Sequence, residues 1–127
     1  PDVQSLAFSL DGRSYRKFAQ NPVVKQITPG NRDPKVIWHE PTQRWVMALY
    51  VEQPKGTHTV QFLTSSDLKR WSLASSIAGF FECPDLFPLT LAGQPDKMKW
   101  ILTAADSDYV VGSFDGSTFF PESKKLK

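Results

Sequence analysis

The sequence is poor in cysteine and lacks long apolar runs. Its one cysteine, Cys83, cannot form an intrachain disulfide, so the redox compartment is left open. Neither His39 nor His58 stands at a ligand-like spacing from it, and no metal site is predicted. The longest apolar run, Trp45 to Val51, has seven residues, whereas a membrane-spanning helix needs about twenty. We therefore expect no membrane partner.

An excess of charge of one sign is also missing. Lys and Arg number 15 and Asp and Glu 13, which gives a formal net charge of +2 and no strong attraction to nucleic acid. The basic stretch from Ser123 to Lys127 is interpreted as a solvated tail, with nucleic-acid contact as the minor alternative. No phosphate-binding glycine loop or nucleophile elbow is present. Because no signal-peptide pattern follows Pro1, the localisation is left open.

Proline and glycine, by contrast, are spread along the whole chain and leave little room for a long helix. There are ten Pro and seven Gly, separated by short runs of β-branched and aromatic residues, which predicts an all-β fold. Several runs are continuously apolar, which is typical of strands buried on both faces. The predicted strands are Val3 to Ser9, Lys35 to Trp38, Arg44 to Val51, His58 to Ser65, Arg70 to Ser75, Asp85 to Leu89, Lys99 to Ala105 and Asp108 to Phe114.

One hairpin pattern occurs three times, in SLAFSLDGRSYRKF, TVQFLTSSDLKRWSL and YVVGSFDGSTFFPE. Each segment has an apolar strand, a Ser, an Asp that opens a turn and an aromatic residue four positions after that Asp. An Asp side chain can accept hydrogen bonds from backbone amides two residues on, which closes a tight turn. The three Asp–aromatic pairs are Asp11 with Tyr15, Asp67 with Trp71 and Asp115 with Phe119.

A repeat of about fifty residues with four short strands is typical of a β-propeller blade. We predict outer strands of one blade in residues 1–31, one complete blade in 32–81 and most of the next in 82–127. A closed propeller has about four to eight blades. We therefore expect a partial propeller of about two and a half blades. The alternative is a small β-sandwich whose hairpins are similar by accident.

Two carboxylates, Asp33 and Glu82, are predicted just before the first strands of neighbouring blades. First strands line the axis of a propeller, so the two side chains would converge on one funnel. Convergent carboxylates suit glycoside hydrolysis. The alternatives are a turn-forming Asp33 and a local ion pair with Arg32. We interpret Cys83 as a small packing residue beside Glu82 and not as a nucleophile, since no base is evident.

The motifs RDPKV and ECPDLF, with SLAFSLDG and FDGSTFFPE, resemble those of family 32 glycoside hydrolases, the invertases, levanases and inulinases. The resemblance covers essentially the whole chain. It implies a five-bladed β-propeller and retaining cleavage of β-fructofuranosyl linkages in sucrose or fructans, without a metal or other cofactor. By the same resemblance, Asp33 matches the transition-state stabiliser, Arg32 an arginine of the sugar subsite, and Glu82 the general acid/base.

The chain departs from the family at the nucleophile, an aspartate in an NDPNG motif that is absent here. The stretch beginning at Asn21 has no acid, and the NRDP at Asn31 continues as the second motif. We therefore expect the middle of a catalytic domain, inactive alone and able to self-associate through its terminal blades. The alternative is a non-catalytic carbohydrate-binding or assembly piece. The choice among sucrose, levan and inulin is open.

Overall fold

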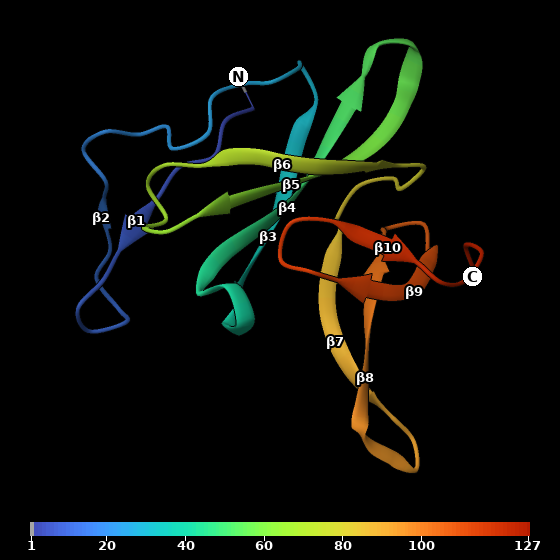
Figure 1. Cartoon of the computed structure of the whole chain (residues 1–127). Coiled ribbons are helices and arrows are strands. Elements are labelled where there is room, and N and C mark those ends of the chain that lie inside the picture. The colour runs from blue at the N-terminus through green and yellow to red at the C-terminus, as the bar shows by residue number, and fades with distance from the viewer. Residues whose placement is uncertain (1) are drawn as a thin grey trace.

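The computed structural model describes residues 2–127, which form ten strands and two short 3-10 turns (Figure 1). Every sheet is an antiparallel meander. The smallest sheet pairs β1 (Ala7–Phe8) with β2 (Arg16–Lys17). The second contains β3 (Asn31–His39), β4 (Arg44–Gln53), β5 (Thr57–Ser65) and β6 (Ser72–Ala78). The third contains β7 (Asp85–Leu91), β8 (Gln94–Thr103), β9 (Tyr109–Phe114) and β10 (Phe119–Pro121).

The two four-stranded sheets confirm the all-β prediction and the repeat. Their first strands, β3 and β7, lie beside each other, as the first strands of neighbouring propeller blades do. The 3-10 turns Glu40–Thr42 and Pro54–Gly56 form the β3–β4 and β4–β5 connections. The prediction of a strand from Val3 to Ser9 was largely wrong. Only Ala7–Phe8 is in a sheet, because the earlier part bonds to the chain near Val24 through a single bridge at Gln4.

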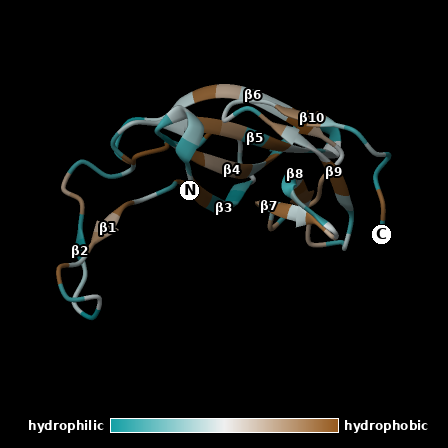
Figure 2. Cartoon of the chain, turned by 60° about the horizontal axis from the view of Figure 1, so that its bottom comes forward, coloured by the Kyte–Doolittle hydropathy of each residue, from teal (hydrophilic) through white to brown (hydrophobic). Residues whose placement is uncertain are grey.

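The main core lies between the two four-stranded sheets, where Val46, Ala48 and Phe62 meet Leu86 and Leu102. Apolar residues follow the strands of both sheets (Figure 2). A smaller cluster on the other face of β4 comprises Val24, Met47, Leu49, Val51 and Leu63. Alternate residues of β4 therefore face opposite cores, which confirms that its continuous apolar run marks a strand buried on both faces.

The three repeated turns have the same hydrogen-bonding geometry, as predicted. In each turn one Asp Oδ1 accepts hydrogen bonds from the backbone N–H groups two and three residues later, at 2.7 to 2.9 Å. These bonds lower the pKa of Asp11 and of Asp67 from 3.8 to about 2. Burial alone would raise the pKa of Asp115, but the amides of Thr118 and Ser117 leave it lowered. The turns thus favour ionised aspartate.

The Asp67 turn predicts a specific loss of stability in acid. Because the pKa of Asp67 is about 2 in the folded protein and 3.8 is its ordinary value, its contribution is complete above pH 4 and is lost as the pH falls to 2. Asp67→Asn keeps an oxygen acceptor but does not titrate. We expect the melting temperature of the wild type to fall more between pH 4 and pH 2 than that of Asp67→Asn. Asp96→Asn is the control, since Asp96 is exposed and makes no side-chain hydrogen bond or ion pair with residues 2–127. If the melting temperatures of the wild type and Asp67→Asn fell equally between pH 4 and pH 2, this account of the turn would be contradicted.

Candidate functional site

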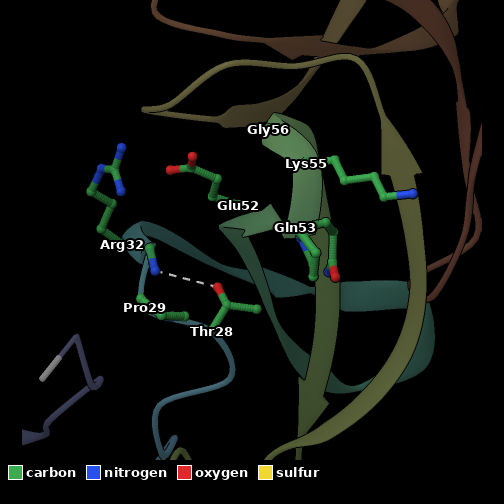
Figure 3. A pocket seen from close by; sticks show the side chains of 9 residues that line it. Thr28, Pro29, Arg32, Glu52, Gln53, Lys55 and Gly56 are labelled. Atoms are coloured by element: carbon green, nitrogen blue, oxygen red, sulfur yellow. Dashed lines mark hydrogen bonds between the residues drawn. The ribbon is translucent and has the colours of Figure 1, made fainter.

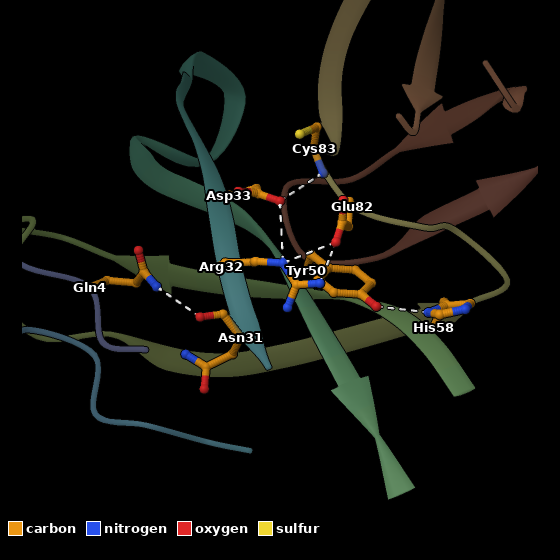
Figure 4. Close-up of polar contacts among 8 residues, drawn as sticks. All are labelled: Gln4, Asn31, Arg32, Asp33, Tyr50, His58, Glu82 and Cys83. Atoms are coloured by element: carbon orange, nitrogen blue, oxygen red, sulfur yellow. Dashed lines mark hydrogen bonds and ion pairs between the residues drawn. The ribbon is translucent and has the colours of Figure 1, made fainter. Parts of the chain in front are cut away.

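The candidate site lies where β3 and β7 approach each other (Figure 4). Lys35 Nζ on β3 is 2.9 Å from Asp85 Oδ1 on β7, which joins the middle of β3 to the start of β7. Glu82 precedes β7, as predicted. Asp33 does not precede β3 but lies within it, at a register irregularity between Arg32 and Lys35. The bulge follows from Pro34, which has no N–H for the ladder, and it changes the direction of the neighbouring side chains.

Arg32, Asp33 and Glu82 are brought together across fifty residues of sequence. Glu82 Oε1 accepts hydrogen bonds from Arg32 Nε, at 3.2 Å, and from Arg32 Nη2. Asp33 Oδ2 accepts one from the backbone N–H of Cys83, at 3.2 Å. Arg32 Nε lies 4.0 Å from Asp33 Oδ2, so the local pair considered from the sequence is the looser contact. Three hydrogen bonds, two donated by the RDP motif and one by the ECP motif, therefore hold the two motifs against each other.

The backbone at this junction is strained. Asp33, Glu82 and Cys83 have φ angles of 57°, 53° and 40°, in the left-handed region that non-glycine residues rarely adopt. Such conformations each cost on the order of 1–3 kcal/mol and persist only when the surrounding structure imposes them; they cluster at functional sites. Here three of them surround one ion pair, which marks the junction as the candidate site.

The charged side chains remain accessible to a ligand. Side-chain exposure is 36% for Arg32, 31% for Asp33 and 29% for Glu82. The hydrogen bond to Glu82 is the main reason why the pKa of Arg32 is raised. The site therefore presents a charged guanidinium beside two carboxyl groups, a set that can both donate hydrogen bonds to sugar hydroxyls and accept them.

Cys83 is exposed, so its interpretation as a packing residue was wrong. The left-handed φ at this position turns the backbone N–H toward Asp33 and leaves the thiol outside the core. The negative charge of Asp33 is the main reason why the pKa of the Cys83 thiol is raised. A protonated thiol is a poor nucleophile.

Two residues that the sequence reasoning missed lie beneath the site. Tyr50 is fully buried and pairs in register with Arg32, whose Cζ lies 4.8 Å from the centre of the Tyr50 ring. The Tyr50 hydroxyl is 2.7 Å from His58 Nδ1. Counting back from the β3–β4 turn could have located Tyr50 opposite the RDP motif. A regular ladder without the bulge would have paired Tyr50 with Asp33, whereas the structure pairs it with Arg32.

A pocket of about 520 Å³ opens on the other side of Arg32 (Figure 3). Gly30 lies in its wall, and a Cβ there would be 2.9 Å from Glu52 Oε2 and 3.1 Å from Arg32 Nη1. Glycine therefore lets a carboxylate and a guanidinium approach the same space. The full lining consists of Thr28, Pro29, Gly30, Arg32, Glu52, Gln53, Pro54, Lys55 and Gly56.

Residues 2–127 contain no group of three or more His, Cys, Asp or Glu side chains placed to hold a metal ion. Over the same residues, no helix has the length and apolar character needed to cross a bilayer.

Comparison with known proteins gives consistent matches over the whole chain. The profile of the glycosyl hydrolases family 32 N-terminal domain matches residues 1–127. A levanase of Bacillus subtilis is 38% identical over 146 aligned residues, which cover 98% of this chain and 20% of the levanase. An extracellular exo-inulinase of Meyerozyma guilliermondii is 35% identical over 98% of this chain and 27% of its own length.

Solved structures agree with these sequence matches. The β-fructofuranosidase of Schwanniomyces occidentalis complexed with fructosyl-erythritol superposes with a TM-score of 0.84 at 32% identity, over 98% of this chain and 27% of that chain. An exo-inulinase of Aspergillus awamori has a TM-score of 0.80 at 31% identity, over 94% of this chain and 28% of its own. The chain thus spans roughly a quarter of the proteins it matches, and its open sheets are part of a β-propeller. With its motifs, sheets and profile match in agreement, the chain belongs to glycosyl hydrolase family 32.

Proposed function

We propose that this chain is part of a retaining β-fructosidase that cleaves β-fructofuranosyl linkages in sucrose or fructans. In this proposal Glu82 is the general acid/base, Asp33 stabilises the transition state and Arg32 lines the fructosyl subsite. The observation that carries it is the junction of β3 and β7, where Arg32 binds Glu82 and Asp33 binds the backbone of Cys83 while all three side chains stay accessible. We also propose that the blades divide at 31/32 and 81/82.

The proposed reaction has two steps. In the first, Glu82 gives its proton to the leaving-group oxygen as the glycosidic bond breaks, and a carboxylate bonds to the anomeric carbon. In the second, water attacks that carbon, Glu82 takes its proton and the carboxylate leaves. The attacking carboxylate is assigned to a part of the protein outside these 127 residues, since the sequence has no NDPNG motif.

Asp33 and Arg32 would act on the sugar itself. The Asp33 carboxylate can accept hydrogen bonds from fructosyl hydroxyls. These hydrogen bonds become stronger as positive charge develops on the sugar ring in the transition state. Arg32 donates two hydrogen bonds to Glu82 Oε1 and so would hold the acid/base beside the sugar.

Activity measurements on the complete protein test these roles. Glu82→Gln should lower kcat for sucrose or fructan by about 10²–10⁴-fold or more, because the amide can neither give nor take the proton. Glu122→Gln is the matched control, since Glu122 is a surface carboxylate paired with Lys99 on the third sheet. A Glu82→Gln variant with wild-type kcat would disprove the assignment.

The 127-residue polypeptide alone tests the missing nucleophile. We expect it to release no fructose from sucrose, levan or inulin, as measured by reducing-sugar assay against the complete protein. Turnover by the polypeptide would mean that another carboxylate attacks, and the roles given to Asp33 and Glu82 would have to change. An inactive complete protein that still binds fructosides would favour the alternative, a non-catalytic carbohydrate-binding module.

We also propose that the polypeptide self-associates when it is alone. Large apolar side chains are exposed on strands of both large sheets: Leu73 on β6, Leu89 on β7, Met98 on β8 and Phe120 on β10 are 49% to 60% exposed. Association between copies would remove this apolar surface from water, which is favourable. Static light scattering at micromolar concentration should give a mass above the monomer value of 14.3 kDa. A stable monomer with a sharp thermal transition would contradict this expectation.

A further inference from the structure

We propose that Tyr50 is a positioning residue, whose ring holds the Arg32 guanidinium against Glu82. Tyr50 would touch no substrate and would act through Arg32. The inference rests on the proposed function of Arg32 and Glu82, and it assigns a role to a buried residue beneath them.

The first support is the contact between Tyr50 and Arg32. The two residues are direct cross-strand neighbours on β4 and β3, and the guanidinium carbon lies 4.8 Å from the centre of the ring. At this distance the negative face of the ring attracts the cation, and the attraction is stronger where water is excluded. The Tyr50 side chain is fully buried, so the ring is a fixed support for a long and otherwise flexible side chain.

The second support is that Tyr50 also contacts the segment that carries Glu82. Phe81, the residue before Glu82, meets the Tyr50 ring edge to face, with centroids 5.9 Å apart. Phe81 meets His58 in the same way at 4.7 Å, and His58 Nδ1 is 2.7 Å from the Tyr50 hydroxyl. The ring of Tyr50 is thus fixed by His58 and lies against both Arg32 and the residue that precedes Glu82.

The third support is that Arg32 has a competing partner. Arg32 Nη1 makes no hydrogen bond to residues 2–127 and faces the pocket that Glu52 lines. Both Arg32 Nη1 and Glu52 Oε2 lie near one point, at 3.1 and 2.9 Å, so they are at most 6.0 Å apart, the sum of the two distances. Without the ring, a rotation of Arg32 toward Glu52 would release Glu82.

A double-mutant cycle on the complete protein separates positioning from ordinary packing. Tyr50→Leu should lower kcat/KM for sucrose about 10-fold, because the ring face is lost. Tyr50→Phe, which keeps the ring, should stay within about threefold of the wild type. In an Arg32→Ala background, Tyr50→Leu should change kcat/KM by less than about twofold, since its effect passes through Arg32. Equal losses in both backgrounds, or no loss in the wild-type background, would overturn the proposal.

Phe62→Leu is the matched control for lost aromatic volume. Phe62 is as fully buried as Tyr50, lies on the adjacent strand β5 and belongs to the apolar core between the two sheets. We expect this variant to melt at a lower temperature while its kcat/KM stays at the wild-type value. A loss of kcat/KM equal to that of Tyr50→Leu would show that general packing, and not the ring beneath Arg32, controls the rate.

A crystal structure tests the positioning role even if Tyr50→Leu does not fold or the wild type is inactive. If Tyr50→Leu does not fold, Tyr50→Met replaces it, since methionine adapts to irregular space but has no aromatic face. If the complete wild-type protein cleaves neither sucrose, levan nor inulin, the proposed function fails, and a crystal structure of Tyr50→Met still tests the positioning. The Arg32–Glu82 contact should be absent there, and a retained contact would overturn the inference.

Discussion

The ion pair between Arg32 and Glu82 is the contact on which the candidate site depends. Its two residues are fifty positions apart, with Arg32 on β3 and Glu82 just before β7, so it exists only if β3 and β7 lie side by side. It also needs the bulge at Pro34 and the left-handed backbone at Asp33, Glu82 and Cys83. Each of these features is locally unfavourable, and together they place three charged or acidic side chains at one accessible point.

The rest of the fold supplies the rigidity that the strained junction requires. The core between the sheets joins β4 and β5 to the third sheet through fully buried side chains such as Phe62, Leu86 and Leu102. Close-packed interiors resist small displacements and so transmit the constraint to the surface. The Asp turns fix the outer hairpins independently of the site. Strain at the junction is therefore held in place by regular structure on both sides of it.

The sequence was sufficient to predict what depends on local chemistry. The Asp11, Asp67 and Asp115 turns follow from a carboxylate that caps two nearby amides, and the repeat of these turns predicted the meander sheets. The doubly buried β4 followed from its continuous apolar run. The short β1 was not predicted, because its length depends on a contact with Val24 that no local pattern records.

The parts of the site that the sequence did not reveal depend on register and backbone conformation. The bulge shifts the pairing by one residue and so places Arg32, and not Asp33, opposite Tyr50. The exposure of Cys83 follows from a left-handed φ, which the neighbouring residues in the sequence do not predict. Tyr50 was hidden within an apolar run, where its hydroxyl and its cation contact could not be distinguished from ordinary core packing.

The most direct test of the account is a crystal structure of the complete protein carrying Glu82→Gln, with sucrose bound. The account predicts that the fructosyl hydroxyls lie within hydrogen-bond distance of the Asp33 carboxylate and the Arg32 guanidinium, with the glycosidic oxygen facing the side chain at position 82. Sucrose bound elsewhere, with no contact to Asp33 or Arg32, would contradict the claim that the junction of β3 and β7 is a fructoside-cleaving site.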